Sequence, residues 1–448
     1  MDKLYKEGNK EVKPNVVSFN SVLDSWAKSR DKGSAHRAEK ILQWMEKLYS
    51  GGNKDAKPDR ISYNAVINSW AKSNEKMSAQ RAEDTLRRMY NVNDLRPNTT
   101  SFNSVLDSWA KSGEKGSAHQ AEKTFEWMST LHQEGNNDVK PDVISYNSLI
   151  NAWAKSDEKG MAQRAEAILR KMDNLYQNGN KEVKPNTISF NSVIDSWAKS
   201  GDKGSAERAN EILLWMENLH IQGNYDIQPN TISYNSVISA WARSTNNDAF
   251  QKIISLIKQM EDRALQKGCD TLPNKITYTI AIKSLQNSIQ DDKAVLARRM
   301  LAKMKLMMKS GKVEFSPDER AYSAVFSVCS SKHKNENDRR NALKHALEVF
   351  VEAQNCKHAI RYRRSHFYAA MLHVCFSNSR GVEQEAIVKK VLKCCFDDGV
   401  LNGFILTIVN SKLSAESFER IFGVHSVISS DTLQSLPAAW SRNTSKDL

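Results

Sequence analysis

Hydrophobic and polar positions recur along this chain with the period of an α-helix. The apolar side chains of residues 19–26 are spaced by three, four and seven residues, which places them on one face of a helix. After a polar break that includes Gly33, residues 38–48 show the same spacing and predict a second helix, with Ser34 as its N-terminal cap. The pattern therefore predicts helical hairpins and negligible strand.

The hairpin unit is repeated along the chain. A proline followed by Asn or Asp returns every 44 residues, apart from one interval of 39, at Pro14, Pro58, Pro97, Pro141, Pro185, Pro229, Pro273 and Pro317. A fixed period of this length is typical of solenoids, in which each helix pair packs on the next pair and all share one core. We therefore predict an all-α fold, a right-handed α-solenoid (superhelix) of tandem helix-turn-helix repeats.

The similarity between repeats divides the chain into four parts. Six well-matched repeats fill residues 16–274, diverged repeats fill 275–375, and residues 376–448 form a capping or accessory segment with a disordered end. Residues 1–15 match 172–186 at most positions. We therefore expect the chain to begin inside the second helix of a partial repeat, with upstream sequence missing.

One tryptophan lies on the apolar face of the first helix in each matched repeat. This position predicts a core residue rather than a platform for stacking bases. The diverged repeats place Leu285, Cys329 and Cys375 in the same position. The six tryptophans are Trp26, Trp70, Trp109, Trp153, Trp197 and Trp241.

Composition narrows the function classes only partly. The 65 Lys and Arg residues against 52 Asp and Glu give a net charge of +13, which moderately favours a polyanionic partner. The six cysteines lack the regular spacing of a disulfide framework and favour a reducing compartment. No apolar run is long enough to span a bilayer. Phosphate-binding loops and deaminase signatures are absent from the sequence, so we expect no enzyme activity, no cofactor and no metal.

The repeat motif resembles a known family. Each matched unit carries Ser-aromatic-Asn, then Trp-Ala-Lys or Trp-Ala-Arg, and ends on Pro-Asn or Pro-Asp, and most carry Ala-Glu and a Met in the second helix. This motif resembles the pentatricopeptide repeat over roughly residues 1–375, although most of the units here are longer than the family's. The resemblance implies binding of single-stranded RNA, one base per repeat, in a mitochondrion or plastid.

The resemblance also implies which residues recognise the bases. In each repeat these are the polar residue near the start of the first helix and the residue after the closing proline, and we call the two a base-reading pair. The pairs are Asn20/Asp59, Asn64/Asn98, Asn103/Asp142, Asn147/Asn186, Asn191/Asn230, Asn235/Asn274 and Thr279/Asp318. An acceptor-only carboxylate suits the N3–H of uracil, whereas an amide NH2 can donate to N3 of cytosine. By the family's code the seven pairs specify a pyrimidine-rich RNA, UCUCCCG from the 5′ end.

A purely structural role is open for both members of each pair. Asp or Asn before a helix is also the preferred N-cap, because its side chain accepts hydrogen bonds from unpaired backbone N–H groups. The first-helix asparagines could instead form a hydrogen-bond ladder between repeats. Both roles can coexist with base reading.

Two further columns of residues accompany the pairs. The resemblance makes an apolar residue three before each first-helix polar residue a clamp on the bases, with core packing as the alternative; these are Val17, Ile61, Ile144, Ile188, Ile232 and Ile276. Cations lie eight residues after each first-helix asparagine, where they could contact phosphates or simply stabilise the helix C-terminus. They are Lys28, Lys72, Lys111, Lys155, Lys199 and Arg243.

Together these features predict a sequence-selective, single-stranded RNA-binding protein that acts in RNA processing, stability or translation. RNA-processing proteins are further possible partners, and no membrane association is expected. Two alternatives stay open at this point. The chain could be a helical scaffold that binds proteins, or the RNA-binding part of a nuclease whose catalytic domain lies outside it.

Overall fold

A computed structural model describes residues 14–422 and residue 437, apart from short gaps at 30, 74, 93–94, 266–269, 289, 291, 310–315, 334 and 356–363. The predicted partial repeat, except its last two residues, and nearly all of residues 423–448 lie outside the described residues. Within the described part, the chain forms helices and no strand. It divides into two compact units, residues 1–229 and 230–448.

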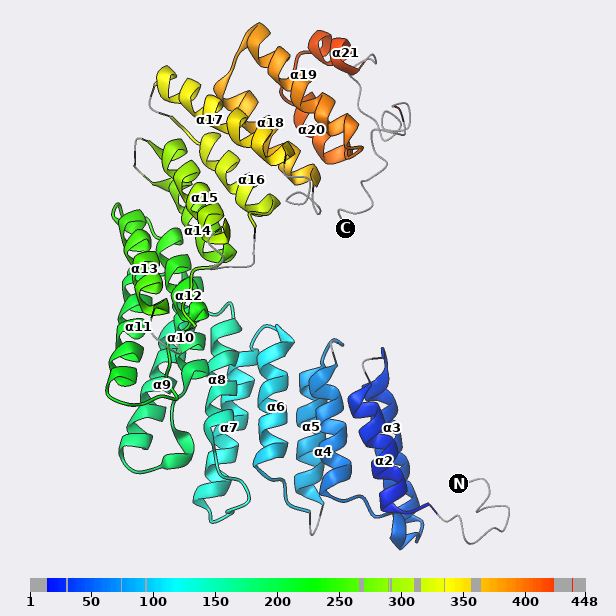
Figure 1. The fold of residues 1–448 in the computed structure, drawn as a ribbon. Coiled ribbons are helices and arrows are strands. Elements are labelled where there is room, and N and C mark those ends of the chain that lie inside the picture. The colour runs from blue at the N-terminus through cyan, green and yellow to red at the C-terminus, as the bar shows by residue number, and fades with distance from the viewer. Residues whose placement is uncertain are drawn as a thin grey trace. The chain divides into compact units, whose positions relative to one another are not determined.

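The first unit is a row of helical hairpins (Figure 1). Each first helix packs on the second helix of its own repeat and, within this unit, neighbouring first helices also pack on one another. Short 3-10 turns η2 (Lys54–Ala56) and η3 (Lys181–Val183) precede two of the first helices. The helices are α2 (Val16–Lys28), α3 (Ser34–Ser50), α4 (Arg60–Lys72), α5 (Ser78–Asn91), α6 (Thr99–Ser112), α7 (Ser117–Gln133), α8 (Val143–Lys155), α9 (Met161–Gln177), α10 (Thr187–Ser200) and α11 (Ser205–Ile221).

The second unit continues the same hairpin pattern. Its first helices α12, α14, α16 and α18 pack on one another in sequence, and each also packs on the helix that follows it. The helices are α12 (Thr231–Arg243), α13 (Ala249–Ala264), α14 (Lys275–Ser284), η4 (Leu285–Asn287), α15 (Lys293–Lys309), α16 (Glu319–Cys329), α17 (Glu336–Asn355), α18 (Arg364–Asn378), α19 (Gly381–Asp397), α20 (Gly403–Asn410) and α21 (Ala415–Phe422). The predicted all-α solenoid is confirmed, and the handedness of its superhelix stays a prediction.

The division between the two units differs from the boundary that sequence similarity suggests. The well-matched repeats end at Asn274, but the second unit begins at Asn230, one repeat earlier. The predicted boundary between matched and diverged repeats concerns sequence similarity alone, and it stays a prediction. Within the second unit, α12 and α14 pack together as neighbouring first helices of the first unit do.

The core residues follow the predicted pattern. Five of the six tryptophans are buried, and Trp26 in α2 is half-buried beneath the guanidinium of Arg37. Leu285, Cys329 and Cys375 are fully buried in the same position of the diverged repeats. The tryptophan position is therefore a packing position throughout, as predicted.

The turn inside each hairpin differs from the prediction. Gly33 directly precedes α3 with a φ of 83°, in the left-handed region that favours glycine. Ser34 is the first helical residue and makes no capping hydrogen bond, so its predicted role as a cap was wrong. In the second repeat the glycine is replaced by Met77, whose φ of 62° is the one positive value among the described non-glycine residues.

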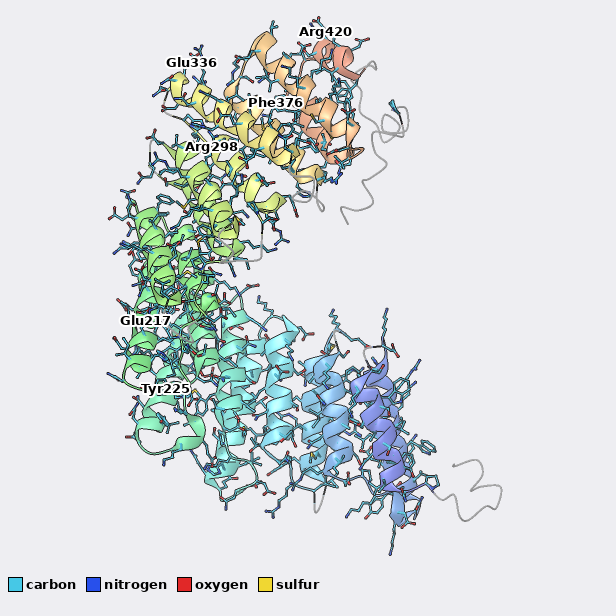
Figure 2. The ribbon with its side chains drawn as sticks, viewed as in Figure 1. Glu217, Tyr225, Arg298, Glu336, Phe376 and Arg420 are labelled. Atoms are coloured by element: carbon cyan, nitrogen blue, oxygen red, sulfur yellow. The ribbon has the colours of Figure 1, made fainter. Side chains whose placement is uncertain are left out.

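Two kinds of contact, apolar burial and hydrogen bonding, hold connections between repeats in place. Four of these connections carry one buried apolar residue, which is Ala56, Val139, Val183 or Ile227. In addition, the Oγ1 of Thr187 at the start of α10 donates to the carbonyl of Gln228, in the connection that follows α11. Tyr225 of the same connection is 78% exposed, and Figure 2 labels it there. These contacts fix where each following first helix begins.

Candidate functional site

The residue after each closing proline caps the next first helix. Asp59 accepts the backbone N–H of Ser62 at 2.9 Å, and the Ser62 Oγ accepts the backbone N–H of Asp59 at 3.2 Å, which makes a capping box. Asn186 makes the same arrangement with Ser189. The predicted capping role is therefore present. It uses only Oδ1, an atom that Asp and Asn share.

Two further caps, Asn230 and Asn274, belong to the second unit. Asn230 precedes α12, and its Oδ1 accepts the backbone N–H groups of Ile232 and Ser233, both at 3.1 Å. Asn274 precedes α14, and its Oδ1 accepts the backbone N–H of Thr277 at 3.1 Å. The structure thus gives Asn230 and Asn274 the capping role that was the alternative to base reading. Base reading by Asn230 and by Asn274 stays a prediction.

The two members of most base-reading pairs lie side by side. The Nδ2 of Asn20 in α2 donates to Asp59 Oδ1 at 3.1 Å, across the boundary between two repeats. The equivalent bonds measure 3.1 Å from Asn103 to Asp142, 3.4 Å from Asn147 to Asn186 and 3.4 Å from Asn235 to Asn274. The fifth pair, Asn191 with Asn230, spans the boundary between the two units, and its geometry stays a prediction.

A serine that the sequence analysis missed orients the first-helix asparagine. Ser62 Oγ donates to Asn20 Oδ1 at 2.7 Å, and so it links the cap to the preceding repeat. The corresponding distances are 2.6 Å from Ser101, Ser145 and Ser189 and 2.7 Å from Thr277 to the asparagines Asn64, Asn103, Asn147 and Asn235. The signal was present in the sequence, because a Ser or Thr stands three residues after every one of these caps. The expected ladder between repeats therefore exists.

Two pairs depart from this arrangement. Asn64 accepts from Ser101, but no hydrogen bond joins its side chain to that of Asn98. In the seventh pair, Thr279 Oγ1 donates to the carbonyl of Lys275 within its own helix, and no hydrogen bond links it to Asp318. The ladder is therefore most regular in the well-matched repeats.

The atom that distinguishes Asp from Asn is not needed for capping. Asn186 Oδ1 accepts from the backbone of Ile188 and Ser189 and from Asn147, whereas its Nδ2 makes no hydrogen bond to any described residue. Asp142 likewise uses Oδ1, and its Oδ2 accepts no hydrogen bond from the described residues. Asn186 and Asp142 are both half-buried. At these caps the choice of Asp or Asn therefore sets whether a free donor or a free acceptor is offered at the surface.

The predicted clamp residues are exposed. Val17, Ile61, Ile144, Ile188, Ile232 and Ile276 have between 52% and 67% of their surface accessible. Core packing, the alternative explanation for this column, is therefore wrong. Each of these residues lies one helical turn before the first-helix polar residue of its repeat, on the same face. A row of exposed aliphatic side chains thus accompanies the base-reading pairs.

The basic column alternates between two environments. In the first, third and fifth matched repeats the lysine forms an ion pair with an aspartate four residues earlier, as Lys28 does with Asp24 at 2.6 Å. The same pairing joins Lys111 to Asp107 and Lys199 to Asp195. In the second, fourth and sixth matched repeats the residue four positions before the cation is Asn68, Asn151 or Ser239, which carries no charge. Lys155 makes no ion pair with a described residue, and Lys72 donates to the carbonyl of Ala27 at 3.4 Å.

The described residues contain no cluster of three or more His, Cys, Asp or Glu that could hold a metal ion. None of the helices in this described part combines the length and the hydropathy of a membrane span.

Comparison with known proteins agrees with the repeat geometry. The model of the pentatricopeptide repeat domain matches residues 4–73 and 129–200, which include the first helices of the first, second, fourth and fifth matched repeats. These two regions are therefore similar to pentatricopeptide repeats. No curated protein sequence matches it.

Two solved structures of one pentatricopeptide repeat protein are similar to this chain. The crystal structure of PPR10 from maize has a TM-score of 0.52 at 15% identity, over 97% of this chain and 56% of that one. A structure of PPR10 in complex with an 18-nt psaJ RNA element has a TM-score of 0.46 at 17% identity, over 99% and 57%. This chain therefore spans a little over half the length of the protein it matches. At this level of identity, the first match shows a shared fold.

Proposed function

We propose that this chain binds single-stranded RNA along its first helices, with one base held at each repeat. The observation that carries the proposal is the column of exposed aliphatic residues beside the base-reading pairs. Exposing an isoleucine forgoes about 1.5–3 kcal/mol of burial free energy, so the fold gains nothing from this placement. The faces of nucleic acid bases are apolar and can cover such side chains whatever the sequence.

We propose that the base edges meet the cap residues. The free Nδ2 of Asn186 can donate to N3 of cytosine, and the free Oδ2 of Asp142 can accept from N3–H of uracil. This chemistry supports the pyrimidine-rich sequence UCUCCCG as the preferred RNA. Its biological consequence would be control of RNA processing, stability or translation by occupancy, in the mitochondrion or plastid that the resemblance to the pentatricopeptide repeat family suggests.

We propose that phosphate contacts are made by the basic column, and more strongly by Lys155 than by the lysines that pair with an aspartate. An aspartate beside Lys28, Lys111 or Lys199 competes with a phosphate for the ammonium group. Lys155 has no such competitor among the described residues. Exposed ion pairs contribute only about 0–1 kcal/mol, so the competition weakens the contact without preventing it.

The aliphatic column supplies the test. In the double variant Ile144→Ala/Ile188→Ala, affinity for the UCUCCCG RNA should fall by about tenfold or more, because each side chain loses apolar contact with a base. The melting temperature should hardly change, since both side chains are more than half exposed. Ile221→Ala is the matched control, because Ile221 is 74% exposed but ends a second helix away from the column. Equal RNA affinity in the double variant and the control would favour a protein-binding scaffold.

A further inference from the structure

A contact among three residues recurs between the second helices and the following repeat. Tyr63 in α4 donates its hydroxyl to Glu46 Oε1 in α3 at 2.8 Å. The same carboxylate pairs with the guanidinium of Arg88 in α5 at 2.7 Å. The tyrosine lies 17 residues after the glutamate and the cation 42 residues after it. The carboxylate thus satisfies a buried hydroxyl and a cation together.

The second unit contains the same arrangement at the same spacings. Tyr278 in α14 donates to Glu261 Oε1 in α13 at 3.0 Å. Lys303 in α15 pairs with that carboxylate at 2.8 Å. The spacing of 17 and 42 residues therefore identifies the contact wherever it is complete.

At the interface of α7, α8 and α9 the carboxylate is missing. The tyrosine and the cation are kept as Tyr146 and Lys171, but Ser129 stands in the glutamate position. Ser129 Oγ donates to the carbonyl of Phe125 in its own helix, so it does not replace the carboxylate. Tyr146 is only 5% exposed, and its hydroxyl makes no hydrogen bond to a described residue. Lys171 likewise has no ion pair within the described part of the chain.

A cavity of about 240 Å³ occupies this place. Its walls include the hydroxyl-bearing Tyr146, the exposed Lys171 and the apolar side chains of Phe125 and Leu149. The volume is several times that of one water molecule. Glu122 and Arg164 also line the cavity and form an ion pair with each other at 2.6 Å. Glu126 lines it as well and is exposed, so a ligand with a second negative charge would be repelled.

We propose that this cavity binds one carboxylate carried on a short aliphatic stem. The carboxylate would accept the hydrogen bond of the Tyr146 hydroxyl and pair with Lys171, as Glu46 does with Tyr63 and Arg88. The stem would pack on Phe125 and its neighbours. Such a group exists both in free monocarboxylic acids and in the glutamate side chain of a protein partner. This site does not depend on the proposed binding of RNA.

The test uses two probes, sodium propionate and the peptide acetyl-Ala-Glu-Ala-amide, observed by saturation-transfer NMR. We expect at least one probe to bind with a Kd on the order of 1–10 mM, as small ligands with one ionic contact do. Binding of the peptide alone would indicate a protein partner, whereas binding of propionate alone would indicate a free acid. Acetyl-Ala-Gln-Ala-amide, which lacks the charge, should not bind.

Four variants locate the site. Ser129→Glu supplies the missing carboxylate from within the chain, so it should abolish probe binding and raise the melting temperature. Tyr146→Phe and Lys171→Gln should each weaken binding at least fivefold. Lys171 is exposed, so its replacement leaves the fold intact. Glu46→Ser is the matched reverse change and should create a second binding site. Failure of both probes to bind at 50 mM, or binding unchanged in Ser129→Glu, would overturn the proposal.

Discussion

The substitution Asn186→Asp isolates the single atom on which base reading is proposed to depend. It replaces the free amide Nδ2 with a carboxylate oxygen and keeps Oδ1, which accepts from the backbone of Ile188 and Ser189 at 3.1 and 3.2 Å. The chain already contains the product of this change. Asp142 caps its helix and accepts from Asn103 at 3.1 Å, so the carboxylate fits the same position.

The expected effect on stability is small. The capping bonds persist, and a negative charge at a helix N-terminus contributes about 0.3–1 kcal/mol in favour of folding. The melting temperature should therefore stay the same or rise slightly. Differential scanning calorimetry of the two proteins would measure this difference.

The expected effect on RNA preference is larger. At the fourth nucleotide, cytosine loses a hydrogen bond and uracil gains one, each worth about 1 kcal/mol. The ratio of the Kd values for UCUCCCG and UCUUCCG should therefore swing by about 2 kcal/mol, or roughly 30-fold. Fluorescence anisotropy with the two RNAs and the two proteins gives the four Kd values.

A matched control removes the effect of added charge. Asn180 also caps a helix, η3, through its side-chain oxygen, but it belongs to no base-reading pair. Asn180→Asp should lower the affinity for both RNAs by the same factor. If Asn186→Asp also leaves the ranking of the two RNAs unchanged, Asn186 is only a cap and the proposed reading chemistry is wrong at this position.

Three further results are expected. Asp107→Asn removes the ion-pair partner of Lys111, so the slope of log K against log salt concentration for RNA binding should become steeper by about 0.7. An unchanged slope would mean that Lys111 stabilises the helix end and does not contact phosphate. Met77→Gly removes a left-handed strain of about 1–2 kcal/mol but adds about 0.4–1 kcal/mol of unfolded-state entropy. The free energy of unfolding, measured by urea denaturation, should therefore rise by about 0 to 1.6 kcal/mol, and a fall would contradict the strain. Burial raises the pKa of Cys329 and Cys375 to about 12, so iodoacetamide at pH 8 should modify these thiols only after unfolding. The free energy of unfolding should also fall as the pH rises above about 9, where the thiols of the unfolded chain ionise. Rapid modification of the folded protein, detected by mass spectrometry, would contradict their burial.

Much of the fold could be predicted because each repeat states the same pattern again. The apolar spacing around Trp70 and the Pro-Asp before Arg60 indicate a helix and its cap, and the structure places both as predicted. The turn could not be predicted fully. Glycine in four other repeats suggests a left-handed residue before the second helix, but the sequence does not show that Met77 adopts this conformation too.

The site was harder to predict than the fold. A first-helix isoleucine such as Ile188 could lie in the core or at the surface. Its spacing from Asn191 fits a position on either side of the boundary between the buried and the exposed face of the helix. Only the packing of neighbouring helices shows that it is exposed. Contacts between repeats, such as Ser62 with Asn20, depend on the distance between adjacent first helices, which periodicity does not specify. Ser129 stands where the equivalent contact has a glutamate, and this difference can be recognised only once the contact between Tyr63 and Glu46 has been located.

Selection from a random pool of single-stranded RNA tests the central claim most directly. The pool should be incubated with the purified chain at moderate salt, and the bound RNAs sequenced after several rounds. The proposal predicts enrichment of pyrimidine-rich RNAs that contain UCUCCCG, with a shift to uracil at the fourth position for Asn186→Asp. Retention of no RNA above the background would contradict RNA binding, and retention without any sequence preference would contradict recognition of one base per repeat.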